Sequence, residues 1–250
     1  MEDPLSPDAG DAAPADAREL ERIRSEYERR RREVPGEDAR MRRFLHEWRE
    51  RALLAELRRA GSLPLSGRRI LDVGCGGGQW LVDFEAWGAR RADLAGIELD
   101  PERAAQARER LAPTGAGPSA GEADVRAGNA GELPWPDGSF DVVLQATMLS
   151  SILDQGVRRR VAGEMSRVLA PSGTIVSYDM RIGNPRNPHV RRLGKRELGD
   201  LFDGFAIRSR RVTLAVPVSR RLVRRSWSAA SLLERARFLD THLLAIIRRP

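Results

Sequence analysis

The sequence predicts an α/β fold built around a parallel sheet, and three observations predict it. Strand-like and helical segments alternate along residues 69–179, which is the rhythm of a parallel sheet. The first strand, residues 70–73, leads directly into a glycine cluster, and a second apolar stretch, residues 94–97, ends at Glu98. Both features therefore fall at the carboxyl ends of strands, where open α/β sheets bind their ligands.

The glycine cluster reads Asp-Val-Gly-Cys-Gly-Gly-Gly and begins at Asp72. Gly74, Gly76 and Gly78 let the backbone turn sharply and approach a ligand, because no Cβ is in the way. The pattern lacks the last glycine of the dinucleotide-binding fingerprint. Glu98 follows 20 residues after Gly78, and a carboxylate there can accept hydrogen bonds from both ribose hydroxyls. Together these features indicate a cofactor that contains a nucleoside, whereas a tight turn and an unrelated exposed glutamate are the simpler alternative.

These motifs resemble those of the class I S-adenosylmethionine-dependent methyltransferases. The resemblance covers about residues 68–180 and rests on residues 72–78, 96–101, 128–134, 139–144 and 164–173. Two positions depart from the usual pattern, because Glu98 replaces the commoner aspartate and Asn129 also stands where aspartate is usual. The resemblance implies a Rossmann-like sheet of seven mostly parallel strands, with helices on both faces, an antiparallel last strand and extra N-terminal helices.

The resemblance also implies S-adenosyl-L-methionine as the cofactor, together with the residues that bind it. These residues are Asp72, Gly74, Cys75, Gly76, Gly78, Glu98, Leu99, Asn129, Ala130 and Gln145. In this set the glycine turn and Asp72 surround the methionine end, and Glu98 holds the ribose. Leu99 packs on the adenine, while the amide oxygen of Asn129 contacts the adenine amino group with Ala130 beside it. Gln145 lines the region of methyl transfer.

The chain is expected to fall into three parts. Residues 1–17 are rich in proline, alanine and aspartate and are expected to form a disordered leader. Residues 18–62 are expected to form N-terminal helices that cover the site, and residues 63–250 to form the methyltransferase domain. At 250 residues, this is one domain with additions.

The N-terminal helices are predicted over residues 19–34 and 41–60, where apolar residues recur three and four apart. In the methyltransferases that the chain resembles, such helices fold over the cofactor and substrate. Tyr27 and His46 could therefore face the site. The favoured interpretation is that Tyr27 packs in the core and that His46 lies on a solvated helix face.

The remaining elements follow in order from apolar runs and from glycine and proline signals. Strands are predicted at residues 69–73, 93–98, 123–127, 140–146, 174–179, 205–216 and 241–247, and helices at 78–88, 101–111, 158–169, 195–202 and 219–238. Pro101 occupies a favourable first-turn position, and residues 171–173 are predicted to form a turn. Two Asn-Pro pairs in residues 181–189 predict a polar loop over the ligand crevice.

Composition narrows the classes of function. No stretch reaches the roughly 18 apolar residues that a membrane span requires. Cys75 is the only cysteine, so no internal disulfide can form, which is typical of a cytoplasmic protein. Cys75 is more simply a small residue of the glycine turn than a nucleophile. No histidine and cysteine cluster has the spacing of a structural zinc site, so no metal is predicted, although the sequence leaves a carboxylate-bound magnesium ion open.

The net charge of +7 is unevenly distributed, because residues 181–250 carry 17 basic and 5 acidic side chains. Lys195 is the only lysine, and such an arginine bias resembles the coding bias of a GC-rich genome. The favoured interpretation is a solvated surface. An anionic small-molecule substrate is the next alternative, because arginine binds phosphate in a bidentate manner. Nucleic acid is the least favoured partner, and the oligomeric state is left open.

Candidate general bases are few, because the chain has three histidines. Asp179 ends the fifth strand near the expected sulfonium, and His189 lies in the Asn-Pro loop, so these two are the predicted catalytic residues. The alternative is that Asp179 caps a turn and that His189 is an exposed loop residue. His242 is expected to be structural. Asp154 is expected either to touch substrate or to cap a helix.

Residues 148–154, the Asn-Pro loop and residues 241–244 resemble a narrower group, the bacterial methyltransferases of glycan and natural-product biosynthesis. This resemblance favours O-methylation of a sugar or natural-product intermediate. N-methylation of a small molecule is the nearest alternative. An RNA or protein methyltransferase is less favoured, because the fourth strand runs into Gln-Ala-Thr-Met rather than an Asn-Pro-Pro-Tyr type motif. A non-catalytic protein that has kept the cofactor pocket is least favoured.

Overall fold

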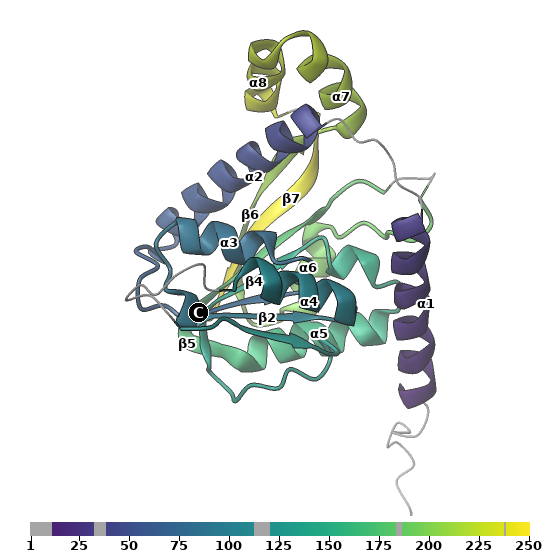
Figure 1. Ribbon diagram of the computed structural model, residues 1–250, viewed down its shortest axis with the longest axis vertical. Coiled ribbons are helices and arrows are strands. Elements are labelled where there is room, and N and C mark those ends of the chain that lie inside the picture. The colour runs from purple at the N-terminus through teal and green to yellow at the C-terminus, as the bar shows by residue number, and fades with distance from the viewer. Residues whose placement is uncertain (1–11, 33–38, 113–120, 184–186, 238) are drawn as a thin grey trace, which may run out of the picture.

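The computed structural model describes residues 12–32, 39–112, 121–183, 187–237 and 239–250. At its centre is a seven-stranded sheet with the order β3-β2-β1-β4-β5-β7-β6 (Figure 1). The strands are β1 (Ile70–Val73), β2 (Leu94–Glu98), β3 (Asp124–Ala127), β4 (Phe140–Ala146), β5 (Leu169–Met180), β6 (Ala206–Leu214) and β7 (Asp240–Arg248). β7 pairs antiparallel with β5 and β6, and the other strand pairs are parallel. The predicted Rossmann-like sheet, with its antiparallel ending, is confirmed.

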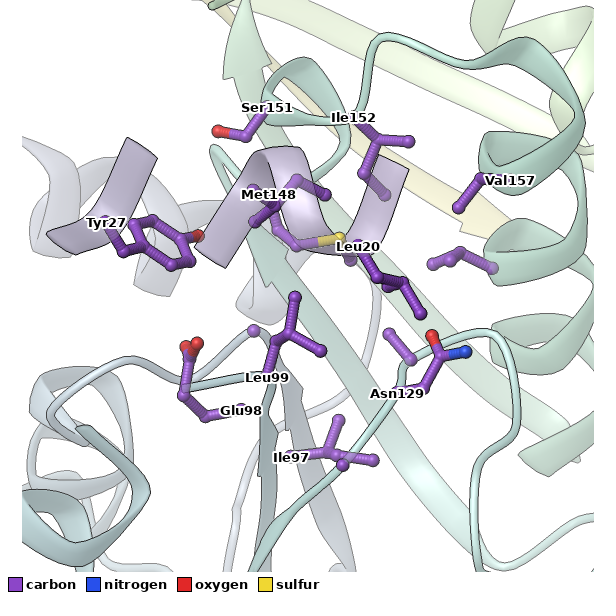
Figure 2. A pocket seen from close by; sticks show the side chains of 15 residues that line it. Leu20, Tyr27, Ile97, Glu98, Leu99, Asn129, Met148, Ser151, Ile152 and Val157 are labelled. Atoms are coloured by element: carbon purple, nitrogen blue, oxygen red, sulfur yellow. The ribbon is translucent and has the colours of Figure 1, made fainter. Parts of the chain in front are cut away.

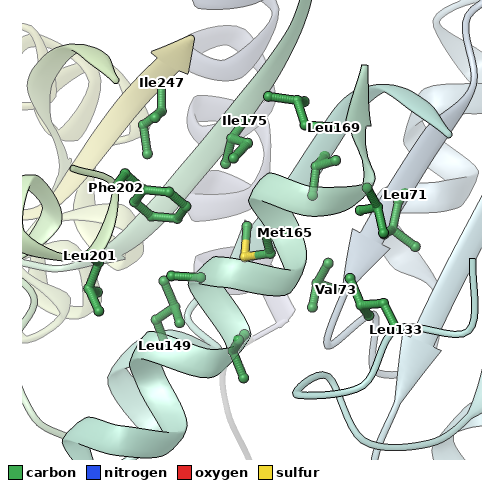
Figure 3. Packing of buried hydrophobic residues seen from close by; sticks show 14 of the residues in the cluster. Leu71, Val73, Leu133, Leu149, Met165, Leu169, Ile175, Leu201, Phe202 and Ile247 are labelled. Carbon is green, nitrogen blue, oxygen red and sulfur yellow. The ribbon is translucent and has the colours of Figure 1, made fainter. Parts of the chain in front are cut away.

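Helices cover both faces of the sheet. They are α1 (Ala12–Arg32), α2 (Ala39–Arg59), α3 (Gln79–Ala86), α4 (Pro101–Arg110), α5 (Gln155–Val168), α6 (Lys195–Leu201), α7 (Val216–Arg225) and α8 (Trp227–Ala236), with short 3-10 turns η1 (Arg91–Asp93) and η2 (Leu149–Ser151). Successive strand side chains point to opposite faces. Ile70 therefore packs with α2, α3 and α4, whereas Leu71 and Val73 pack with α5 and α6 (Figure 3).

Two N-terminal helices precede the sheet, as predicted. α1 begins at Ala12, so residues 12–17 of the expected disordered leader are helical, and residues 1–11 lie outside the described part of the chain. The helix extends earlier because Ala12, Ala13, Ala15 and Ala17 favour helix. α1 lies along the end of the sheet where β1 and β4 terminate (Figure 1).

The C-terminal region departs from the prediction at residues 219–238. Two helices, α7 and α8, occupy this stretch instead of one. Ser226 separates them in an extended conformation, and its hydroxyl accepts a hydrogen bond from the Ala229 N–H at 3.2 Å, which caps α8. Val223 and Ala230 of these helices pack on Phe44 of α2, so the pair forms a separate projection beside α2 (Figure 1).

Strand β5 starts earlier than predicted. It begins at Leu169, so residues 171–173 belong to the strand rather than to a turn. The pairing with β4 shifts register between Phe140 and Val142, and this irregularity accommodates Pro171. In the part of the chain that the structure describes, no helix is long and apolar enough to cross a membrane.

Candidate functional site

The loop after β1 is held by the backbone of the neighbouring strand. The N–H groups of Gly74 and Cys75 both donate to the Ile97 carbonyl of β2, at 2.8 and 3.0 Å. Gly74, Gly76 and Gly78 have φ values of +75°, +56° and +78°. A Cβ at Gly78 would lie 2.9 Å from the Ala107 Cβ, because α4 packs against the loop. Glycine is therefore required here for both conformation and packing.

Glu98 completes this loop from the end of β2. Its carboxylate is buried and accepts hydrogen bonds from the Gly76 N–H at 2.8 Å and the Asp100 N–H at 3.1 Å. The Asp100 side chain caps α4 by accepting from the N–H groups of Glu102 and Arg103. The first turn of this helix brings Arg103 to 4.0 Å from Glu98. The two sequence motifs, the glycine turn and Glu98, thus form one hydrogen-bonded unit.

A cavity lies above this unit, at the carboxyl edge of the sheet (Figure 2). Its enclosed volume is about 40 Å³, below the roughly 300–1,000 Å³ of typical small-molecule pockets. Of the predicted cofactor-binding residues, Gly74, Glu98, Leu99, Asn129 and Ala130 line it. These five residues come from three separate strand ends, and the structure brings them together as the sequence predicts.

Helix α1 supplies a wall of this cavity, where the sequence analysis expects N-terminal helices over the site but does not assign Leu20 or Ile23 to it. Leu20, Ile23 and Tyr27 line the cavity from above, as Figure 2 shows for Leu20 and Tyr27. Their spacing of three and four residues was the available signal, but it does not reveal what the apolar face of the helix covers. Arg103 lies 4.9 Å from the Tyr27 ring centre, so the α1 wall also contacts α4.

Two polar side chains hold α1 in place. Glu19 accepts hydrogen bonds from the Leu153 N–H at 2.5 Å and from Arg22 at 2.7 Å. Arg22 in turn donates to the Ser151 carbonyl at 2.6 Å. Burial alone would raise the pKa of Glu19, but these hydrogen bonds keep it below its ordinary value. α1 is thereby tied to the segment between β4 and α5, which forms the opposite wall of the cavity.

Asp72 is buried beneath the glycine loop. It is 1% exposed, and neither carboxylate oxygen has a hydrogen-bond partner among the described residues. Burial, followed by the nearby charges of Glu98 and Asp83, raises its pKa to about 8. An unpaired buried carboxylate is costly, and an ammonium group beside it would offset that cost. Asp72 therefore has the environment of a carboxylate that would pair with a ligand's ammonium group.

Two other predicted cofactor-binding residues, Cys75 and Gln145, do not line the cavity, and Asn129 lines it with its side-chain oxygen already engaged. Cys75 points away from the cavity into the core beside Gly96, and burial raises the pKa of its thiol, so it is a packing residue and not a nucleophile. The fully buried Gln145 does not line the cavity. Its amide donates to the Ser177 hydroxyl at 2.6 Å and accepts from Met148 and Leu149. The Asn129 oxygen accepts from the Gly131 N–H at 2.9 Å.

The two predicted catalytic residues are not brought together. Asp179 is buried and accepts from the N–H groups of Ser150 at 3.0 Å and Met180 at 2.8 Å, so it anchors η2. Burial raises its pKa to about 6, against the opposing effect of the hydrogen bond from Ser150. His189 lies 3.4 Å from Glu26, which links the Asn-Pro loop to α1. Neither residue lines the cavity, and a catalytic role for either stays a prediction.

The remaining candidates have structural contacts. Asp154 caps α5 by accepting from the Val157 N–H at 2.9 Å. His242 stacks on Tyr178 with ring centres 4.8 Å apart, and burial lowers its pKa to about 4. His46 faces away from the cavity and lies 3.2 Å from Asp83 of α3. The hydrogen bond to Asp83 raises the pKa of His46.

Residues 70–173 match a family model described as a methyltransferase domain. A probable S-adenosylmethionine-dependent methyltransferase of Mycolicibacterium smegmatis is 35% identical over 152 residues, which cover 57% of this chain and 53% of that protein. The 27-O-demethylrifamycin SV methyltransferase of Amycolatopsis mediterranei is 34% identical over 129 residues, which cover 49% and 42%. The chain thus spans about half the length of these curated relatives.

Solved structures show the same fold. An S-adenosylmethionine-dependent methyltransferase of Mesorhizobium loti superposes with a TM-score of 0.53 at 22% identity, covering 79% of this chain and 98% of that one. The cyclase SpnF superposes with a TM-score of 0.59 at 20% identity, covering 80% and 81%. At these identities the likeness shows the fold alone, and this fold carries more than one chemistry.

Proposed function

We propose that this chain is a methyltransferase that transfers the methyl group of S-adenosylmethionine to a small-molecule acceptor. The domain match and the methyltransferases of the same fold indicate S-adenosylmethionine as the cofactor. The observation that carries the proposal is the hydrogen-bonded unit of the glycine loop and Glu98 with the unpaired Asp72 behind it. A carboxylate that would bind the ribose and an acid that would pair with an ammonium group thus lie on two neighbouring strands.

The residues present suit the chemistry of methyl transfer. S-adenosylmethionine supplies a methyl group that a sulfonium charge already activates, so the protein mainly has to align the acceptor and exclude water. Asp72 would hold the amino group and Glu98 the ribose, while Leu99 and Asn129 would flank the adenine. The apolar side chains Leu20 and Ile23 of α1 line the cavity and would keep water from it.

The acceptor is proposed to be a hydroxyl group of a sugar or natural-product intermediate. Support comes from the relative in Amycolatopsis mediterranei that methylates an oxygen of a rifamycin. A base is then useful, and Asp179 and His189 remain the proposed candidates. At neutral pH, a pKa of about 6 leaves Asp179 mainly ionised, which is the form that accepts a proton. An amino-group acceptor is the alternative for the same site.

Calorimetry tests the cofactor before any acceptor is known. The full chain should bind S-adenosylmethionine and S-adenosylhomocysteine with micromolar affinity and should not bind a nicotinamide dinucleotide. Transfer of a labelled methyl group to a panel of sugars, hydroxylated natural products and amines then identifies the acceptor class. Absence of binding to both sulfur compounds, with and without candidate acceptors, would overturn the proposal.

A second candidate is a protein that binds the cofactor without transferring its methyl group. The specific observation in its favour is the shared fold with SpnF, which is described as a cyclase. The two candidates differ in turnover, because only a methyltransferase converts bound S-adenosylmethionine to S-adenosylhomocysteine. Micromolar cofactor binding with no labelled product across the whole panel would favour this second candidate.

A further inference from the structure

A second pocket lies between α2, the end of β6 and α8, and it shares no lining residue with the cavity above the glycine loop. Its volume is about 220 Å³. The residues that line it are Trp48, Arg51, Ala52, Ala55, Arg210, Arg211, Val212, Glu234, Arg235, Arg237 and Asp240. Five of them are arginines and two are carboxylates, so the pocket carries a strong positive charge.

The two carboxylates offset only part of the charge of these five arginines, although Asp240 interacts electrostatically with Arg237, Arg210 and Arg211. Glu234 is buried and accepts hydrogen bonds from the backbone N–H groups of Thr213 at 2.9 Å and Leu214 at 2.6 Å. This contact fixes α8 to the end of β6. Asp240 begins β7 and is 1% exposed, and neither of its oxygens accepts a hydrogen bond from a described residue.

The arginines fall into two groups. Arg51 and Arg210 already have acidic partners, because Arg51 lies 3.4 Å from Glu47 and Arg210 lies 3.0 Å from Glu56. The other three are Arg211, Arg235 and Arg237, which are exposed. Over the described ranges of the chain, none of these three forms an ion pair or a hydrogen bond. Arg211 comes from β6, Arg235 from α8 and Arg237 from the position that follows α8, and all three line the pocket.

Two further groups in the pocket wall lack partners. The indole Nε1–H of Trp48 is a buried donor without an acceptor, and both oxygens of Asp240 are buried acceptors without a donor, among the residues that the structure describes. Buried polar groups are nearly always hydrogen-bonded, since leaving one unpaired costs free energy. One side of the pocket therefore requires an acceptor and another requires a donor.

We propose that this pocket binds a small hydroxylated anion of the sugar-phosphate class. The phosphate would be bound by Arg211, Arg235 and Arg237, because a guanidinium donates to phosphate oxygens in a bidentate manner. A phosphate oxygen would also accept from Trp48, and a sugar hydroxyl would donate to Asp240. This combination accounts for the arginine excess and for the unpaired buried groups together. It does not depend on the proposed methyl transfer.

The test uses the full chain and two probes, inorganic phosphate and glucose 1-phosphate, in calorimetric titrations. The double variant Arg211→Ala/Arg235→Ala removes two arginines of the pocket that form no ion pair or hydrogen bond with a described residue. The double variant Arg220→Ala/Arg221→Ala is the matched control, because it removes the same charge from the exposed face of α7. Trp48→Phe removes the indole donor while keeping an aromatic ring.

Both probes should bind the unmodified chain saturably, and glucose 1-phosphate should bind more tightly by about tenfold, because its hydroxyls satisfy Asp240. Arg211→Ala/Arg235→Ala should weaken the binding of both probes by about tenfold or more. The control Arg220→Ala/Arg221→Ala should weaken it by less than about twofold. Trp48→Phe should weaken the binding of both probes without unfolding the chain. Absence of saturable binding, or equal losses in the two double variants, would overturn the proposal. Equal affinity for the two probes would overturn the role of Asp240.

Discussion

The glycine-loop site and the arginine pocket are built in opposite ways. At the glycine loop, Glu98 already accepts two backbone hydrogen bonds, and most of the polar groups are bound to the fold itself. In the arginine pocket, the indole N–H of Trp48 and the carboxylate of Asp240 have no hydrogen-bond partner among the described residues, and three arginines form no ion pair or hydrogen bond there. The glycine loop and Glu98 are therefore preorganised, although Asp72 behind them has no hydrogen-bond partner, whereas the arginine pocket lacks partners for groups on two of its sides. The contrast teaches that a site built from neighbouring strand ends leaves a recognisable sequence motif, and that a site assembled from distant elements need not.

The largest expected effect is the loss of stability caused by a substitution in the preorganised glycine loop. Gly78→Ala places a Cβ within 2.9 Å of Ala107 at a φ of +78°, so we expect a loss of at least about 3 kcal/mol of unfolding free energy. Gly67→Ala is the matched control, because Gly67 has a φ of +77° and nothing within 4 Å. It should lose only about 1 kcal/mol. Urea denaturation measures both, and equal losses would contradict the packing argument.

Replacement of the Glu98 carboxylate is expected to have the next largest effect. Glu98→Gln retains the shape but turns an amide N–H₂ toward one of the two backbone N–H groups that Glu98 now accepts from. We expect affinity for S-adenosylhomocysteine to fall by about 10–100-fold, because the loop anchor and the ribose acceptor are both weakened. Calorimetry gives the affinity. An unchanged value would remove Glu98 from the cofactor site.

Asp72→Asn should separate stability from binding. The pKa of Asp72 is raised from 3.8 to about 8, so the folded state holds the proton more tightly than the unfolded state does. Its contribution to stability therefore falls as pH rises from about 4 to about 8. We expect Asn to stabilise the cofactor-free protein by about 1–3 kcal/mol near pH 8 and by less near pH 5. Cofactor affinity should fall at the same time. A stability gain that does not depend on pH would contradict this account.

The smallest expected effect is the change in unfolding free energy caused by a substitution in the arginine pocket. Arg235→Ala should change the unfolding free energy by less than about 0.5 kcal/mol without ligand, because Arg235 is exposed and forms no ion pair with a described residue. Arg210→Ala should cost more, since Arg210 pairs with Glu56 and donates to the Ala52 carbonyl at 3.0 Å. Denaturant titration of the two variants compares them directly. A larger loss for Arg235→Ala would show that α8 depends on it.

The sequence was sufficient to predict the sheet and much of the wall above the glycine loop. Those features are local, because a strand, a glycine turn and a terminal acid lie within about thirty residues of one another. Gly74, Glu98 and Asn129 line one cavity because the carboxyl ends of parallel strands meet at one edge, and their roles toward a cofactor stay predictions.

Long-range contacts account for what the sequence did not predict. The roles of Leu20 and Arg103 depend on how α1 and α4 pack over the loop, which no local pattern specifies. The same reason applies to the arginine pocket, where Trp48 meets residues almost two hundred positions later. Gln145 illustrates the opposite case, because its position at a strand end was predicted correctly while its amide is engaged by Ser177 and η2.

Helix α1 has a consequence for the residence time of a bound cofactor. Because Glu19 and Arg22 fasten α1 to Leu153 and Ser151, a molecule beneath it is released only as fast as these bonds open. Glu19 has a lowered pKa. Its contribution to the stability of the folded state is therefore fully present when the pH is above the ordinary pKa of a glutamate, and it is lost as the pH falls through the lowered pKa. We expect exchange of S-adenosylhomocysteine to be slow at neutral pH and to accelerate in Glu19→Gln. Turnover would then be limited by a helix that makes no bond to the reacting atoms.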